Sequence, residues 1–241
     1  MLIIAIPKSA STALMKTIGK LHFIEAMQLF ALDLPVPNNL KILQEFHTDI
    51  KELDDKHAKI FSNETKIFKQ HLPPTVNNIE RLKSTKKVVL LREPDEIIQS
   101  YKRSFNKNLS SGLKRFEGVE TDDEWIKEAS KSGLKEDLDF FYNKWKSEEG
   151  KNTMIIYYKD LMSDAKKVIN QIESFFDIPL TKKKFSLSKV RYSQTSKFGG
   201  IVLNNYQKIK SLFFEFIKQL GLYNYLLRFM RFLLSGASKK M

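Results

Sequence analysis

The sequence predicts an α/β protein with three layers, in which a central, mostly parallel sheet is flanked by helices. Short apolar runs suited to buried strands lie at residues 2–6, 88–91 and 154–158, and segments with the apolar spacing of helices separate them. Strands that alternate with helices usually pair in parallel and are covered on both faces, which explains why these runs are apolar throughout.

The chain begins with a strand and a helix. Residues 2–6 are apolar until Pro7 ends the strand. Helical spacing then runs over residues 11–32, and Ser11 or Thr12 is the predicted N-cap.

The next segments alternate between loop, helix and strand. Prolines and asparagines indicate a loop at residues 33–40, and the mostly polar residues 41–58 favour helix. Residues 66–74, KIFKQHLPP, are predicted to form a brief strand that ends in polar residues and a double proline. After the strand at 88–91, Asp95 is expected to cap a helix over residues 96–105.

The second half of the chain is predicted to contain a long polar segment, a further helix and strand of the sheet domain, and a C-terminal helical extension. Residues 106–135 are polar with weak periodicity, which predicts a mobile excursion. An amphipathic helix follows over residues 136–147, and the strand at 154–158 leads into another helix. The last residues are basic and rich in aromatics, so we divide the chain into a domain of residues 1–205 and a helical extension of residues 206–241.

The composition points to anionic partners. The chain has 41 lysine and arginine residues against 28 aspartate and glutamate residues, a net charge of +13, which favours nucleotides, sulfated ligands, nucleic acid or an acidic membrane. It has no cysteine, which excludes disulfides and thiolate metal sites. No apolar run approaches the roughly 20 residues of a spanning helix or suits a signal peptide, so a cytoplasmic location is expected.

Polar stretches follow the predicted strands, at the edge of the sheet where ligands bind. The first, PKSAST (7–12), leads into a helix N-terminus, which offers free N–H groups to an anion, and Lys8 adds a positive charge. The glycines of a nucleotide P-loop are missing, which argues against an ATP or GTP site. An ordinary N-cap turn with a solvated lysine is the alternative.

The stretch VVLLREPDEIIQS places Arg92 at the end of a strand and Ser100 on the following helix. An arginine fork and a hydroxyl suit a second phosphate. A surface ion pair of Arg92 with Glu93 or Asp95 is the alternative.

Together, these stretches resemble the motifs of sulfotransferases that use 3'-phosphoadenosine 5'-phosphosulfate (PAPS), a family with a P-loop NTPase-like fold. PKSASTAL (7–14) is similar to the family's 5'-phosphosulfate loop, and REPDEIIQS (92–100) to its 3'-phosphate motif. KQHLP (69–73) is similar to the K-T-H-L-P segment with the catalytic base, and YKDL (158–161) to the Y-E-D-L segment. The resemblance spans roughly residues 2–200. It implies transfer of a sulfuryl group to a hydroxyl or amine, which leaves 3',5'-bisphosphoadenosine (PAP).

The resemblance also implies roles for the matching residues. His71 is the implied catalytic base, while Lys8 and Lys69 stabilise charge on the transferring group. These cations take the place of a metal, so no metal is expected. The implied cofactor-binding residues are Lys8, Ser9, Ala10, Ser11, Thr12, Ala13, Arg92, Ser100, Tyr158 and Lys197.

The sequence departs from the family pattern at several positions. Ala10 stands where the family has glycine, so we expect the loop to use backbone conformations that alanine tolerates. Ala13 replaces a large residue that often stacks on adenine, and Tyr158 is the candidate to replace it. Lys159 replaces the glutamate of Y-E-D-L. The family's late glycine-rich loop is matched only weakly by TSKFGG, in which Lys197 would contact the 3'-phosphate.

The four histidines fall into two groups. His22, His47 and His57 occur in helical patterns without polar neighbours, so we expect surface or packed residues. His71 follows a strand and lies beside Lys69 and two prolines, a setting that suits a general base.

Two other function classes remain open. A basic module that binds a nucleotide, nucleic acid or a membrane without catalysis explains the charge but not the ordered motifs, and no nucleic-acid signature is found. A nucleotide kinase is disfavoured by the missing P-loop glycines. Residues 33–65 and 106–135 are expected to select the acceptor, for which carbohydrate, lipid-linked and small-molecule classes stay open. Residues 206–241 either pack on the domain or make peripheral contact with a membrane.

Overall fold

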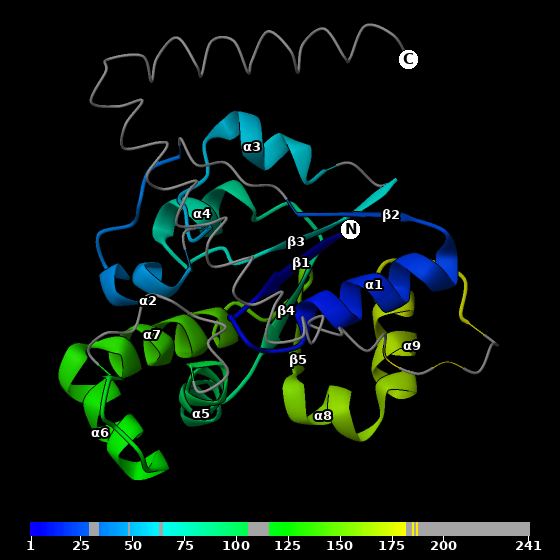
Figure 1. Ribbon diagram of the computed structural model, residues 1–241. Coiled ribbons are helices and arrows are strands. Elements are labelled where there is room, and N and C mark those ends of the chain that lie inside the picture. The colour runs from blue at the N-terminus through cyan, green and yellow to red at the C-terminus, as the bar shows by residue number, and fades with distance from the viewer. Residues whose placement is uncertain are drawn as a thin grey trace, which may run out of the picture. The chain divides into compact units, whose positions relative to one another are not determined.

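A parallel sheet forms the centre of the protein (Figure 1). The computed structural model describes residues 1–28, 34–47, 49–62, 65–105, 116–181, 185 and 187. Within them, five strands pair in the order β2-β3-β1-β4-β5, and every pair is parallel. The predicted α/β class is therefore confirmed. The strands are β1 (Leu2–Ala5), β2 (Glu25–Met27), β3 (Lys66–Gln70), β4 (Lys87–Leu91) and β5 (Thr153–Tyr157).

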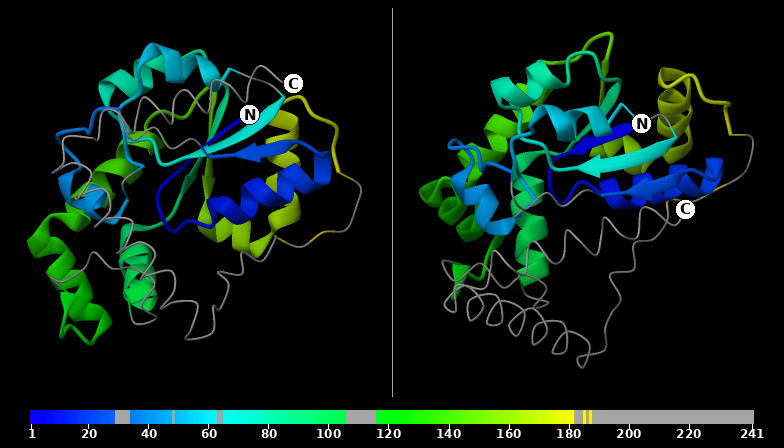
Figure 2. Two further views of the ribbon diagram at one scale, coloured as in Figure 1. Left: turned by 45° about the horizontal axis from the view of Figure 1, so that its top comes forward. Right: turned by 90° about the horizontal axis from the view of Figure 1, so that it is seen from above.

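Helices cover both faces of this sheet. Leu2 and Ile4 of β1 pack into one apolar core, while Ile3 and Ala5 pack into a second core on the opposite face. The second core includes α1 and α9, which lie on the same side of the sheet (Figure 2). The helices are α1 (Ser11–His22), α2 (Lys41–Phe46), α3 (Asp55–Ile60), α4 (Val76–Arg81), α5 (Pro94–Phe105), α6 (Asp122–Ser132), α7 (Leu134–Lys146), α8 (Tyr158–Ser163) and α9 (Ala165–Phe175).

The predicted helix over residues 11–32 is wrong for residues 23–28, and residues 29–32 lie outside the described residues. The chain leaves the helix at Phe23, whose backbone has φ 56° and whose N–H donates to the Gly19 carbonyl. A side chain on Gly19 would bring its Cβ to 2.9 Å from the Ile24 carbonyl oxygen, so the close return of the chain requires glycine. The residues after this turn form β2, which pairs with β3 at the edge of the sheet.

Two further helix boundaries differ from the prediction. The stretch 41–58 forms two short helices, α2 and α3, and Asp54 caps the second by accepting from the His57 N–H at 2.7 Å. Helix α5 begins at Pro94 rather than after a cap at Asp95. Proline suits the first turn of a helix because the N–H that it lacks has no partner there.

The predicted mobile excursion is wrong for its second part. Residues 106–115 lie outside the described residues, but α6 follows as a regular helix with a capping box between Thr121 and Glu124. The rings of Phe116 and Trp125 are fully buried and stacked, with their centroids 4.2 Å apart. These aromatics therefore belong to the core.

None of the helices described above is long and apolar enough to cross a membrane. The predicted extension of residues 206–241 lies outside the described residues, and so does Lys197. The division at residue 205 stays a prediction.

Candidate active site

Four polar stretches lie together at one edge of the sheet. They follow β1, β3, β4 and β5, and these strands are parallel, so their carboxyl ends point the same way. Ligands of open parallel sheets bind at this edge. The candidate site is therefore built from the β1–α1 loop, the β3–α4 connection and the starts of α5 and α8.

The β1–α1 loop adopts a strained backbone. Ala10 precedes α1 with φ 66° and ψ 18°, and Lys8 has φ 63°. The expectation that the loop uses conformations suited to alanine is wrong, because this left-handed region costs a non-glycine residue about 1–2 kcal/mol. The loop keeps a backbone that glycine would adopt freely.

Two hydrogen bonds hold this loop in place. The buried Ser9 hydroxyl donates to the Ile6 carbonyl at 2.6 Å, and Arg92 Nη1 donates to the Lys8 carbonyl at 2.8 Å. The Ser9 hydroxyl proton is thus used inside the loop. Ser11 and Thr12 begin α1, where helix geometry leaves N–H groups without intrahelical partners. These groups suit an anion.

Arg92 connects the loop to α5 and α8. Its Nε lies 3.0 Å from Glu96 Oε2, and its guanidinium carbon lies 4.0 Å from the centroid of the Tyr158 ring. The ion pair of Arg92 is therefore with Glu96 and not with Glu93 or Asp95, the two alternatives considered from the sequence.

Helix α5 supplies polar groups that the sequence did not single out. Lys8 Nζ donates to Ser104 Oγ at 3.0 Å and lies 5.5 Å from the centroid of the Tyr101 ring. Burial lowers the pKa of the Lys8 ammonium. Ser104 Oγ in turn donates to the carbonyl of the predicted site residue Ser100 at 3.0 Å.

The end of β3 and the residue after it carry a buried lysine–histidine pair, Lys69 and His71. His71 Nδ1 lies 2.7 Å from the Ala5 carbonyl, which can only accept, so Nδ1 carries the proton and Nε2 keeps its lone pair. Lys69 Nζ donates to this lone pair at 2.7 Å. Burial, followed by the charge of Lys69, lowers the pKa of His71 to about 3. Burial lowers the pKa of Lys69 to about 8. His71 is therefore a neutral imidazole.

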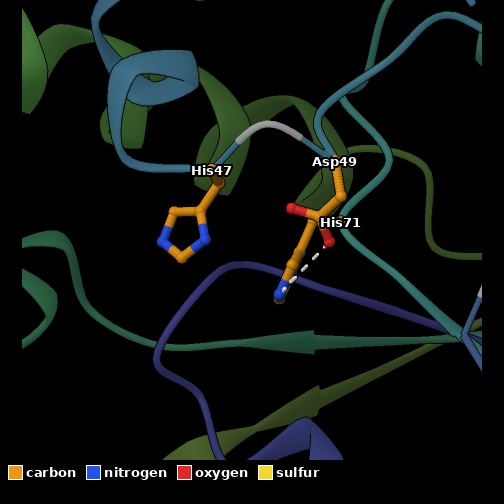
Figure 3. Close-up of side chains that lie close together, drawn as sticks. All are labelled: His47, Asp49 and His71. Carbon is orange, nitrogen blue, oxygen red and sulfur yellow. Dashed lines mark ion pairs between the residues drawn. The ribbon is translucent and has the colours of Figure 1, made fainter. Parts of the chain in front are cut away.

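A second histidine and a carboxylate lie beside this pair (Figure 3). The rings of His47 and His71 are 5.4 Å apart between centroids, and Asp49 Oδ2 lies 4.0 Å from His71 Nε2. His47 Nε2 forms a 2.7 Å hydrogen bond with the Tyr101 hydroxyl. Burial, followed by the charge of His71, lowers the pKa of His47 to about 3. The sequence did not identify His47, Asp49 or Tyr101, because no local motif connects them to His71.

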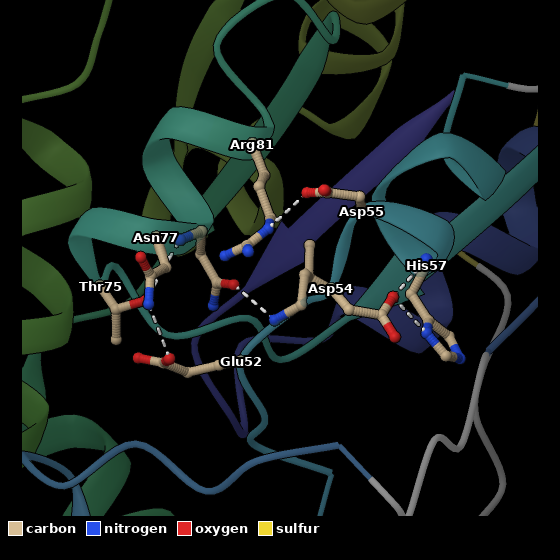
Figure 4. Close-up of polar contacts among 9 residues, drawn as sticks. Glu52, Asp54, Asp55, His57, Thr75, Asn77 and Arg81 are labelled. Atoms are coloured by element: carbon tan, nitrogen blue, oxygen red, sulfur yellow. Dashed lines mark hydrogen bonds and ion pairs between the residues drawn. The ribbon is translucent and has the colours of Figure 1, made fainter.

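Each of the three histidines that we expected to be surface or packed residues has a polar partner in the structure. His47 bonds to Tyr101, as above. His22 Nε2 lies 2.8 Å from the buried Glu173 carboxylate. His57 bonds to its own helix cap, with Nδ1 2.7 Å from Asp54 Oδ1 (Figure 4). Of the three, only His47 lies beside the predicted base.

His47, Asp49 and His71 place ligand atoms within 4.8 Å of one another, a spacing that a metal ion could bridge. However, the Lys69 ammonium already donates to His71 Nε2, and the other ring nitrogen is bound to the Ala5 carbonyl. An ammonium at this position repels a divalent cation. The charges therefore suit an anion better, and a site without metal stays our prediction.

The sequence matches the model of the sulfotransferase domain over residues 1–216. The search of curated proteins found no match.

Several solved structures are similar in fold. A mouse sulfotransferase complexed with PAP aligns with 16% identity and a TM-score of 0.49, over 76% of this chain and 59% of that one. A sulfotransferase from Alicyclobacillus acidocaldarius aligns with 11% identity and a TM-score of 0.46, over 80% and 86%. Retinol dehydratase in complex with androsterone and inactive cofactor PAP aligns with 14% identity and a TM-score of 0.43, over 75% and 60%. This chain thus spans about three fifths of the mouse protein. Because the family model matches most of its length, the chain belongs to the sulfotransferase domain family.

Proposed function

We propose that this protein transfers a sulfuryl group from PAPS to a hydroxyl or amine acceptor by in-line displacement. The observation that carries the proposal is the neutral His71, whose Nε2 lone pair lies beside the Lys69 ammonium at the same sheet edge as the β1–α1 loop. A base, a cation and a helix N-terminus are what this transfer requires. Membership of the sulfotransferase family supports it.

Each bond change in the transfer has a matching group in the site. The acceptor oxygen attacks sulfur while His71 Nε2 takes the acceptor's proton, and Lys69 gives up its hydrogen bond to that nitrogen. The bond from sulfur to the bridging oxygen breaks, and the electron pair leaves with PAP. Lys8 and Lys69 stabilise the negative charge that develops there.

The β1–α1 loop and Arg92 provide two anion sites. The N–H groups and hydroxyls of Ser11 and Thr12 suit the 5'-phosphosulfate. Arg92 suits the 3'-phosphate, and Ser100 on α5 is the predicted second contact. Arg92 covers one face of the Tyr158 ring, so adenine would stack on the other.

The acceptor is expected to approach from residues 33–65 and 106–135, of which 106–115 lie outside the described residues. A small cavity of about 20 Å³, room for one water molecule, lies beside residues 33–65 and is lined by Asp49, Lys51, Leu53, His57 and Gln70, among others. A larger cavity of about 770 Å³ between β5 and α9 contains none of the predicted site residues. The acceptor class is left to a panel of carbohydrates, lipid-linked sugars and small molecules tested with labelled PAPS.

Thermal unfolding with PAP or ATP tests the cofactor. PAP at about 100 times its Kd should stabilise the protein by about 2.7 kcal/mol, which raises the Tm, while ATP should have a much smaller effect. A protein that responds to neither nucleotide would contradict the proposal. Equal stabilisation by both would favour the alternative, a basic binding module without catalysis.

Replacement of His71 tests the chemistry. His71→Ala should lower kcat by at least about 100-fold, the usual contribution of a general base, and leave the PAP-induced rise in Tm intact. His22→Gln is the matched control, because this histidine lies at the end of α1 away from the β1–α1 loop and contacts Glu173, and it should keep full turnover. If His71→Ala also loses PAP binding, His71 has a structural role.

A further inference from the structure

We infer that Asp49 is a positioning residue of this reaction, whose carboxylate stabilises the imidazolium that forms when His71 takes the acceptor's proton. The inference rests on the proposed function, because it assigns a role within the same transfer. It adds a residue that no motif in the sequence indicates.

The geometry places the carboxylate at the nitrogen that gains the proton. Asp49 Oδ2 lies 4.0 Å from His71 Nε2, and Figure 3 shows the Asp49 carboxylate beside the edge of the His71 ring. The Asp49 side chain is only 10% exposed, so solvent screens this interaction weakly. Its other contact is a 2.8 Å hydrogen bond that Gln28 Nε2 donates to Oδ2.

The surrounding charges make such a carboxylate necessary. The groups that face His71 are Lys69 from β3, Lys8 from the β1–α1 loop and His47 from the end of α2, and both lysines disfavour a proton on the ring. Among the described residues, Asp49 is the one acidic side chain that acts on Lys69, and it raises the pKa of that lysine against the effect of burial. The Ala5 carbonyl favours the charged His71, but it lies at Nδ1 and not at the nitrogen that gains the proton.

The segment that carries Asp49 is fixed to the segment that carries His71. The side chain of Asn78 accepts from the Leu53 N–H at 2.8 Å and donates to the Pro73 carbonyl at 2.9 Å. Exposed pairs reinforce this connection between the α3 and α4 regions, among them Asn77 with Glu52 at 3.0 Å (Figure 4). The distance from Asp49 to the base is therefore set by the fold.

The test compares Asp49→Asn with Glu52→Gln. Both changes remove one negative charge from the same segment, but Glu52 contacts the exposed Asn77 and not the base. Asp49→Asn keeps the side-chain shape and should lower kcat at least about tenfold, which corresponds to one pKa unit in the base. KM for the acceptor and the PAP-induced rise in Tm should change less than about twofold. Asp49→Glu should recover part of the lost kcat, and Glu52→Gln should match the unchanged protein.

The pH profile of kcat separates this role from a merely structural one. Without the carboxylate, both His71 and Lys69 lose their protons more readily, so the acidic and alkaline limbs should both move to lower pH. Unchanged limbs, or a kcat within about twofold of the starting protein, would overturn the inference. Loss of turnover with EDTA that Zn²⁺ restores would also overturn it, since Asp49 would then be a metal ligand.

The two proposals fail in different ways. If the unchanged protein neither responds to PAP nor turns over PAPS, the proposed function is overturned and the role of Asp49 with it. If PAP binds and turnover occurs, but Asp49→Asn behaves like Glu52→Gln, only the role of Asp49 is overturned.

Discussion

Ala10 shows how a loop can keep its backbone when the expected residue changes. Its φ of 66° belongs to the left-handed region, which glycine enters without cost and alanine does not. The Ser9 hydroxyl of the same loop donates to the Ile6 carbonyl, and Arg92 donates to the Lys8 carbonyl of the loop. These hydrogen bonds hold the strained conformation. The resulting strain lies where the phosphosulfate would bind.

Ala10→Gly should therefore stabilise the protein. Removing the left-handed strain stabilises the folded state by about 1–2 kcal/mol. Glycine also gives the unfolded chain more conformational freedom, which destabilises the folded state by about 0.4–1 kcal/mol. We expect a net gain of roughly 0.5–1 kcal/mol in the free energy of unfolding, measured by denaturant titration.

The matched control for this change is Ala13→Gly. Ala13 lies three residues further on, in the first turn of α1, and is buried. Glycine at a helical position costs about 0.5–1 kcal/mol, so the two variants should shift stability in opposite directions. A destabilised Ala10→Gly would show that the loop does not need the left-handed backbone.

Single residues were predictable from the sequence where a local pattern marks them. Lys69 lies near the end of a strand, His71 follows that strand and precedes two prolines, and the structure places the two in contact. His47, Asp49 and Tyr101 come from distant segments, and their proximity to His71 arises only through tertiary packing. Ser9 matched the motif, but the pattern could not show that its hydroxyl donates within the loop.

At the scale of elements, Arg92 is the contact that connects three of them. It extends from the end of β4, donates to the β1–α1 loop and stacks on the first residue of α8. Its partner Glu96 lies in the first turn of α5 and is about half exposed, so the guanidinium is positioned but not neutralised by a buried partner. This arrangement leaves a positive charge at the shared edge of the sheet.

Arg92→Ala should weaken PAP binding by more than about 1.5 kcal/mol, or roughly tenfold in Kd, as for a charge-assisted hydrogen bond. Isothermal titration calorimetry measures the Kd for PAP. Arg81→Ala is the matched control, because Arg81 also forms an ion pair, with Asp55 at 2.9 Å, but lies on α4 away from the loop (Figure 4). Equal affinity of the Arg92 and Arg81 variants would remove Arg92 from the cofactor site.

The elements themselves were predicted unevenly. Strands β1, β4 and β5 consist largely of continuous apolar runs, and such runs predict buried strands. β2 was missed because its exposed residues continue a helical pattern, and only pairing with β3 makes them a strand. The capping box that starts α6 is a local signal and could have been recognised from Thr121 and Glu124.

For the whole molecule, two buried histidines make stability depend on pH. His47 and His71 have pKa values of about 3, below the ordinary value of 6.5, because burial disfavours their charged forms. Between pH 6.5 and 3 the unfolded chain therefore binds protons at these positions that the folded protein does not. The free energy of unfolding is fully retained above pH 6.5 and falls as the pH decreases through this window.

The window between pH 6.5 and 5 isolates these histidines. Each histidine should lower the free energy of unfolding by roughly 2 kcal/mol at pH 5, because the imidazoles are charged there in the unfolded chain and neutral in the folded protein. Asp137 and Asp139 have pKa values raised by burial and act in the opposite direction. Denaturant titration should show a steep slope that His71→Gln and His47→Gln each reduce. If neither substitution flattens the slope, the two imidazoles are not held neutral by the fold, and the basis for a neutral His71 at the active site is lost.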